Sequence, residues 1–265
     1  MIKKVILITF ILCLSSCSQL MKKGGKSSSG KKRGSQSSRP AHYNAKLTLQ
    51  DKSGKFEVVR ESGMAKDKKN YVTKYRVYSV SGPGRKILEQ SIVFATPGVL
   101  SDKVRLMRPH RSQYKVWFDK QLYQTETTVN PKEKSLVVKM ESPEKQWSGT
   151  KKYVFPGGNG IFCYFTQAFE CIKYTGFIDK AIEANAGKVS FHMIWDGFPY
   201  FHEQYLNIAP GPFAQAEMEY DGKTNEGEHR FSVSVSGNAI FYLYNENKEY
   251  VKMFWPAQGL SLYDK

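Results

Sequence analysis

The sequence predicts an all-β, mainly antiparallel fold: a large curved sheet or incomplete barrel with one or two short helices around residues 161–186. Apolar and polar residues alternate with a period of two along most of the chain after Tyr43, as they do in strands. Clusters of Gly, Pro, Asn and Asp separate these segments. With 40% hydrophobic and 14% aromatic residues, the chain can bury a sizeable core.

The first β block covers residues 43–155. Its clearest strand is 71–78, in which Tyr71, Thr73, Tyr75 and Val77 share one face. Turns are expected at 51–54, 81–84 and 130–131, where Gly, Pro, Asp and Asn gather. The other strands are expected at 46–49, 56–60, 87–94, 104–107, 114–118, 122–129, 136–140 and 146–155.

The segment 156–160, Pro-Gly-Gly-Asn-Gly, is the strongest break in this pattern and a candidate subdivision of the domain. After it, apolar residues recur at helical spacing and predict a helix over 161–172, while 178–186 is helix-compatible but short. A second β block covers 188–255. Tight turns at 236–239 and 245–248 make 228–255 a three-stranded meander.

The N-terminus is typical of an export signal. A basic start is followed by the apolar run 5–14, which is shorter than the roughly 20 residues that a membrane-spanning helix needs. The tetrad Leu14-Ser15-Ser16-Cys17 resembles the lipobox of bacterial lipoproteins. That resemblance implies cleavage after residue 16 and acylation of Cys17, with palmitate among the chains. Acyl chains in pairs or more anchor a protein stably.

Ser18, in place of Asp, implies by the same resemblance an outer-membrane lipoprotein that faces the periplasm. Inner-membrane and cell-surface placements stay open as alternatives. The expected organisation is a signal peptide (1–16), a lipidated Cys with a basic tether (17–40) and a single β-rich domain (41–265).

The tether is rich in Gly and Ser, which predicts disorder. It contains no acid, and its seven cations are candidates for contact with anionic lipid or lipopolysaccharide: Lys22, Lys23, Lys26, Lys31, Lys32, Arg33 and Arg39. A plain spacer is the alternative. The formal charge of the chain is +16, which favours anionic envelope partners, while export argues against nucleic acid.

Export also bears on Cys163 and Cys171, because an oxidising compartment and an even number of remaining Cys favour a disulfide. The helix over 161–172 opposes it. Residues eight apart in a helix are separated by about 12 Å of rise, whereas a disulfide requires Cα atoms within about 7 Å. We expect the disulfide, with the helix irregular or displaced. Two free thiols in an unbroken helix are the alternative.

Catalytic and cofactor motifs are absent from the sequence. It contains no G-x-S-x-G elbow and no P-loop or dinucleotide fingerprint. The segment 202–206 fails the H-E-x-x-H pattern at its fifth position. His192 and His202 are weak metal candidates, since folding about Gly197 sets them opposite each other, with His229 or Glu203 as a third ligand. We expect no metal, no cofactor and no catalytic residue.

Two aromatic segments are candidate walls of a ligand cleft for an acyl chain or a sugar: Phe191, Met193 and Trp195 on one strand, and Phe241, Tyr242 and Tyr244 on another. Ordinary core strands are the alternative. The strand pattern is similar to the half-barrels of lipoprotein carriers and related periplasmic lipid-handling proteins, a likeness of fold only.

The sequence therefore predicts a non-enzymatic, membrane-anchored lipoprotein that binds or carries an amphiphilic or polyanionic envelope component. A structural subunit of an envelope protein assembly is the alternative, and an enzyme that cuts wall glycan is a third reading. A deep apolar cavity with cations at its rim favours the carrier, and a filled core with a flat apolar outer patch favours the subunit.

Overall fold

The computed structural model describes residues 45–264, except 83, 102–103, 158–159 and 201–210. The chain divides into two units, residues 1–36 and 37–265, and the described residues belong to the second. The expected signal peptide, Cys17 and the seven cations of the expected tether lie outside the described residues, as do His202 and Glu203. Neither described helix is long and apolar enough to cross a membrane.

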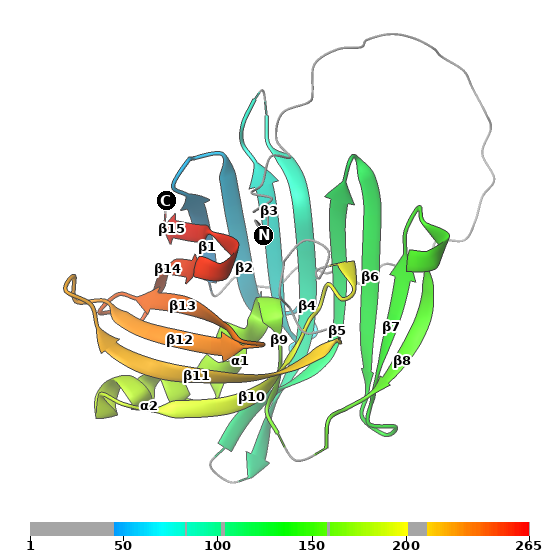
Figure 1. Cartoon of the computed structure of the whole chain (residues 1–265). Helices are drawn as coiled ribbons and strands as arrows, with labels where there is room; N and C mark the ends of the chain where they lie inside the picture. The colour runs from blue at the N-terminus through cyan, green and yellow to red at the C-terminus, as the bar shows by residue number, and fades with distance from the viewer. Residues whose placement is uncertain (1–44, 83, 102–103, 158–159, 201–210, 265) are drawn as a thin grey trace, which may run out of the picture. The chain divides into compact units, whose positions relative to one another are not determined.

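All fifteen strands of the described part of the chain belong to one open sheet, whose edges are β8 (Gly149–Val154) and β9 (Phe162–Tyr164). The strands β1 to β8 are neighbours in chain order, β9 to β15 are likewise, and the pairing of β1 with β15 joins the two series (Figure 1). The sheet is mainly antiparallel, and β9 pairs in parallel with β10. The predicted fold class is thereby confirmed.

The other strands in chain order are β1 (Ala45–Asp51), β2 (Phe56–Met64), β3 (Tyr71–Ser79), β4 (Lys86–Ser101), β5 (Val104–Phe118), β6 (Gln121–Asn130), β7 (Ser135–Glu141), β10 (Lys188–Ile194), β11 (Phe213–Lys223), β12 (His229–Val235), β13 (Asn238–Tyr244), β14 (Tyr250–Trp255) and β15 (Leu260–Asp264). Within the described residues, the helices are α1 (Ala168–Tyr174) and α2 (Phe177–Ala184), with 3₁₀ turns at Lys145–Trp147, Phe165–Gln167 and Pro256–Gln258.

Local turn chemistry sets several of the hairpins. The Asp51 carboxylate accepts hydrogen bonds from the backbone N–H groups of Ser53 (3.0 Å) and Phe56 (2.7 Å), which closes the β1–β2 turn. Ser236 and Gly237 both adopt positive φ, 49° and 75°, as a two-residue hairpin turn requires. The meander predicted over 228–255 is present as β12, β13 and β14.

Three strand predictions need correction. Residues 104–107 and 114–118 belong to one strand, β5, since a register shift that leaves His110 unpartnered accommodates Pro109 within the ladder. The segment 146–155 begins instead as a 3₁₀ turn, and its strand is β8. The strand β15 was not predicted, because five residues are too few to show a clear period.

The predicted helix over 161–172 is also displaced. Residues 162–164 form β9, a 3₁₀ turn follows, and α1 begins at Ala168. Cys163 on β9 and Cys171 on α1 are joined by a disulfide, with Cα atoms 5.9 Å apart. An unbroken helix would hold these Cα atoms about twice as far apart, so the bond and that helix exclude each other.

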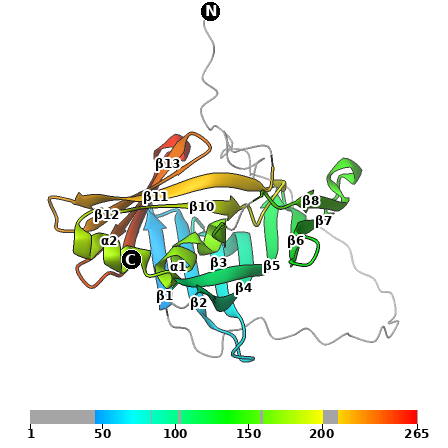
Figure 2. The same ribbon diagram turned by 90° about the horizontal axis from the view of Figure 1, so that it is seen from below.

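The β9 edge of the sheet packs against β5 and β6, which lie near its other edge. The Tyr164 hydroxyl lies 3.0 Å from Oγ1 of Thr127 on β6, and Ser112 Oγ on β5 donates to the Asp196 carbonyl at 3.3 Å. At Gly197, an added Cβ would lie 2.7 Å from the Tyr114 ring, so the backbone can approach only without a side chain. Figure 2 shows α1 and α2 below β10 and β11.

The interior is filled with large side chains, among them Trp195, Trp255, Phe231 and Ile172, all at most 1% exposed. In the described part of the chain, the exposed large hydrophobic residues are Val99, Leu122 and Val154. They lie on three different strands, β4, β6 and β8. This distribution is unlike the flat apolar patch expected of an assembly subunit.

Candidate functional site

A partly enclosed cleft of about 40 Å³ lies at the junction where β1 meets β15. Its volume fits a few water molecules and is well below the roughly 300–1,000 Å³ of established ligand pockets. Most of the lining is apolar, with one cation and a few hydroxyls: Leu49, Val58, Arg60, Tyr75, Phe165, Thr166, Tyr242, Tyr250, Met253, Trp255, Leu260 and Leu262.

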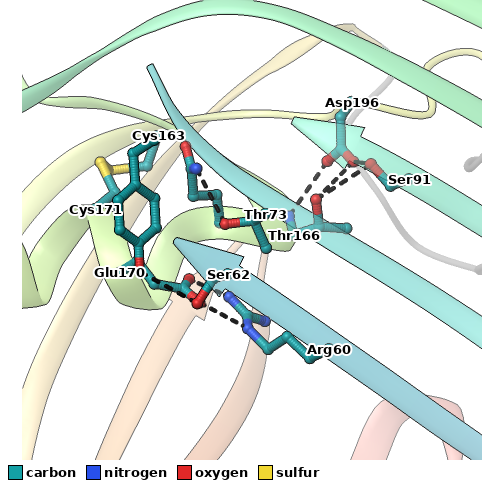
Figure 3. A network of polar contacts seen from close by, with 11 residues as sticks. Arg60, Ser62, Thr73, Ser91, Cys163, Thr166, Glu170, Cys171 and Asp196 are labelled. Atoms are coloured by element: carbon teal, nitrogen blue, oxygen red, sulfur yellow. Dashed lines mark hydrogen bonds and ion pairs between the residues drawn. A yellow bond between two sulfur atoms is a disulfide. The ribbon is translucent and has the colours of Figure 1, made fainter. Parts of the chain in front are cut away.

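Arg60 is the cation of this cleft. It shares a face of β2 with Val58 and Ser62, because side chains two apart in a strand point the same way. Its guanidinium binds the Glu170 carboxylate through two nitrogens, with Nε donating to Oε1 at 2.9 Å (Figure 3). The two side chains are 15% and 10% exposed, so this is a nearly buried, bidentate ion pair.

The pair keeps Arg60 charged despite its burial. Burial alone would lower the pKa of the guanidinium, but the charge of Glu170 and its hydrogen bond outweigh that effect and raise the pKa above its usual value. A charged guanidinium in an apolar lining is a strong donor to carboxylate or phosphate oxygens.

Tyrosines from three strands surround the pair. Tyr75 lies opposite Arg60 across the β2–β3 ladder, while Tyr242 and Tyr250 come from β13 and β14. Burial raises the pKa of Tyr242 to about 12, and raises those of Tyr75 and Tyr250 well above the usual value. All three phenols are therefore neutral at physiological pH and can donate or accept hydrogen bonds.

A buried polar network lies behind Thr166. The Asp196 carboxylate accepts hydrogen bonds from Ser91 Oγ, from Thr166 Oγ1 at 2.8 Å and from the Thr166 N–H at 3.3 Å (Figure 3). Burial raises the pKa of Asp196, and these hydrogen bonds oppose that rise. Asp196 thus fastens the segment after β10 to β4 and to the 3₁₀ turn that lines the cleft.

A further contact holds the start of α1 over β3. The amide of Gln167, the residue before α1, donates to Thr73 Oγ1 at 3.0 Å. The Tyr71 hydroxyl on β3 donates to Ser62 Oγ on β2 at 3.2 Å, which joins these two strands. The disulfide to Cys163 anchors Cys171, the residue that follows Glu170. Glu170 is thereby positioned from a helix that is itself fixed at several points (Figure 3).

The predicted cleft-wall residues fall into three groups. Tyr242 lines the cleft, and Tyr244 is buried beside it with its ring 4.9 Å from that of Phe169. Phe191, Met193 and Trp195 lie in the filled core instead, and each is at most 1% exposed.

Phe241 lies on the opposite face of β13, in an open depression of about 760 Å³. We place the candidate site in the smaller cleft, because the depression faces solvent and its cations, Lys188 and Arg230, are 50% and 48% exposed, so that water screens their charges. Lys188 bonds to Glu217 and Glu219, and Arg230 bonds to Asp221.

The predicted histidine juxtaposition is corrected by the register. His192 lies opposite Gln215 of β11, and its ring stacks on Phe162 at 4.7 Å. The strand β10 therefore pairs with β9 and β11, and it does not form the expected hairpin about Gly197. Among the described residues there is no group of three His, Cys, Asp or Glu side chains that could hold a metal ion.

Sequence reasoning missed Arg60, Glu170 and Asp196. The sequence did contain a signal for Arg60: it shares a strand face with Val58, and a charged residue is unusual on a face that points into the core. Glu170 gave no such signal, because its partner lies 110 positions away in the sequence. The described lining therefore combines a fixed cation, neutral phenols and aliphatic walls, which are groups suited to binding an amphiphile.

No protein-family model matches the chain, and no curated protein matches it. A solved structure that it resembles is a beta-barrel-like protein of a domain of unknown function, DUF1849, from Brucella abortus. The identity is 14%, the alignment covers 83% of this chain and 92% of that one, and the TM-score is 0.39.

Proposed function

We propose that this chain is a membrane-anchored envelope lipoprotein, without catalytic activity, that binds an amphiphilic anion in the cleft around Arg60. The observation that carries this proposal is a nearly buried guanidinium, paired with Glu170, in a mostly apolar lining. An anionic head group would bind Arg60 in place of Glu170, and an acyl chain would pack on Leu49, Met253 and Leu262.

The small volume of the cleft means that a long acyl chain requires the sheet to open. The junction of β1 with β15 is the natural place, because only three residue pairs form that ladder: Leu49–Asp264, Gln50–Tyr263 and Asp51–Leu262. The β2–β3 ladder beside it has nine. Leu49 and Leu262 contribute to both the junction and the lining, so separating the two strands would extend the cleft.

A direct test measures binding of labelled palmitate to the mature unlipidated chain, residues 17–265 with Cys17→Ser, by equilibrium dialysis. The variant is R60M/E170M, in which both charges become apolar so that neither is left buried alone. We expect palmitate to bind at least about tenfold more weakly, the value of one charge-assisted hydrogen bond, and uncharged hexadecanol to bind as before.

The matched control is K139Q/E141Q, which removes an exposed ion pair whose side chains are 58% and 48% exposed. It should leave palmitate binding unchanged. If R60M/E170M binds palmitate as the unsubstituted protein does, or if that protein binds none, the cleft is not an anion site.

An assembly subunit is the second candidate, favoured by the filled interior. It predicts that the protein purified from its own envelope carries a protein partner and no amphiphile. Native mass spectrometry of that preparation distinguishes the two functions.

A further inference from the structure

The β2–β3 turn and the adjoining part of β5, at one end of the sheet, carry a cluster of exposed cations, which we call the basic tip. Lys66, Lys68 and Lys69 lie in the β2–β3 turn, and Arg105 and Arg108 lie on β5. None of the five forms an ion pair with a described residue, and none contributes to the cleft around Arg60.

The β2–β3 turn contacts β4, the strand that pairs with this part of β5. The Thr96 hydroxyl on β4 donates to Oδ1 of Asn70, the residue that ends the β2–β3 turn, at 3.4 Å. Thr96 is also the register partner of Arg108. Asn70, Thr96 and Arg108 are thus neighbours in turn, and they connect the lysines of the β2–β3 turn to the arginines of β5.

The one described carboxylate between these lysines, Asp67, offsets one of the five positive charges, since backbone hydrogen bonds and the charge of Lys69 lower its pKa and keep it ionised. Asp67 accepts hydrogen bonds from the backbone N–H groups of Lys69 (2.8 Å) and Asn70 (3.1 Å), so it closes the turn rather than pairing with a lysine side chain. The described part of the basic tip therefore has a clear positive excess.

The arginines of the basic tip project beyond the neighbouring strands. The β3–β4 ladder ends at the pair Tyr71–Ala95, and the β5–β6 ladder ends at Arg111–Thr128. Beyond these pairs, β4 and β5 continue as a two-stranded hairpin to the pair Ser101–Val104. Six residues of strand extend about 20 Å. This hairpin is at the lower edge of Figure 1.

The described domain also begins at this end of the sheet. Ala45, the first residue of β1, pairs with Ser62, three residues before the β2–β3 turn starts at Ala65. Three residues of strand correspond to about 10 Å. A tether that holds the domain through Ala45 therefore holds it by the end that carries the basic tip.

We propose that the basic tip is a docking surface for the anionic phospholipid head groups of the membrane to which the chain is anchored. This inference rests on the proposed membrane anchor and is independent of ligand binding in the cleft. A cation near an anionic bilayer strengthens binding by about fivefold. Five exposed cations near one end of the sheet can add their attractions to the same anionic surface.

The experiment uses the mature unlipidated chain with all seven tether cations replaced by Gln, so that any vesicle binding comes from the domain. Co-sedimentation is measured with phosphatidylcholine vesicles that contain about 30 mol% phosphatidylglycerol, and with phosphatidylcholine alone. The variant K66Q/K68Q/R105Q/R108Q should bind the anionic vesicles at least about tenfold more weakly. Binding of the parent should fall sharply at about 0.5 M salt.

The matched control is K52Q/K55Q/K86Q/K120Q, which removes the same charge from the opposite end of the same sheet, where these four lysines are also exposed. Each set contains one residue with positive φ, Lys68 at 53° and Lys120 at 69°, so the backbone effects are balanced. The control should bind like the parent.

Equal weakening in both variants would show that net charge alone matters, and absence of anionic-vesicle binding by the parent would show that the domain does not dock. Either result overturns the proposal. Palmitate binding by the same variants separates this outcome from the cleft, because the basic tip contributes no residue to the lining around Arg60.

Discussion

At the scale of single residues, the interior is organised by three ionisable side chains that an apolar core would ordinarily exclude. Arg60 is held by Glu170, and Asp196 is held by Ser91 and Thr166. A buried charge is tolerated only when it is paired or well hydrogen-bonded. These groups are therefore sites where single substitutions should have large effects.

Asp196→Ala should destabilise the fold by about 3 kcal/mol, because it leaves the Ser91 and Thr166 donors buried without their acceptor. Urea unfolding measures the loss. Asp196→Asn, which keeps an acceptor oxygen, should lose less. An Ala variant as stable as the unsubstituted protein would mean that water replaces the carboxylate.

The same residue makes a prediction about pH. Burial raises the pKa of Asp196 in the folded state, so the folded state binds the carboxyl proton more tightly than the unfolded state does. The resulting stabilisation of the fold is fully present below pH 3.8, the usual pKa of Asp, and is lost as the pH rises through the folded-state pKa. The unsubstituted protein should therefore gain stability over Asp196→Asn as the pH falls from 7 towards 3.8. A constant difference between the two proteins across that range would contradict the raised pKa.

At the scale of elements, α1 carries Glu170 to Arg60, and the disulfide fixes α1 to β9. The loop that the bond closes is short, with a sequence separation of eight. The chain-entropy model assigns such a loop about 2.5 kcal/mol of stabilisation.

Cys163→Ala/Cys171→Ala should therefore lower the free energy of unfolding by about 2–3 kcal/mol in urea titrations. Reduction of the unsubstituted protein should have a comparable effect and should leave the double variant unchanged. A double variant with the same free energy of unfolding as the parent would show that the contacts of Gln167 and Glu170 suffice to hold α1.

At the scale of the whole molecule, the two proposals assign different tasks to different parts of one sheet. The cleft lies at the β1–β15 junction, while the basic tip lies in the β2–β3 turn and on β5. Both proposals rely on an anchor at Cys17, which lies outside the described residues.

The anchor is tested by Cys17→Ser, which should leave a larger, unprocessed protein that takes up no labelled palmitate in cells. Cys13→Ser is the matched control, since it changes a cysteine of the expected signal peptide and should leave processing and labelling intact. Labelling that persists in Cys17→Ser would show that another residue is acylated.

The sequence by itself determined the features that are written in neighbouring residues. The period of two along Tyr71–Ser79 predicts a strand without reference to the rest of the chain, and the turn at Ser236–Gly237 predicts a hairpin. Repeated over the chain, these local signals were enough to predict the fold class. The lipobox-like tetrad is likewise read from four adjacent residues.

Only the tertiary structure decided what distant residues form together. The helix expected over 161–172 is displaced because a bond to Cys163 overrides local apolar spacing. The pairing of β1 with β15 and the contact of Arg60 with Glu170 join residues far apart in the sequence. Such contacts depend on how the whole sheet packs, and no short stretch of sequence carries that information.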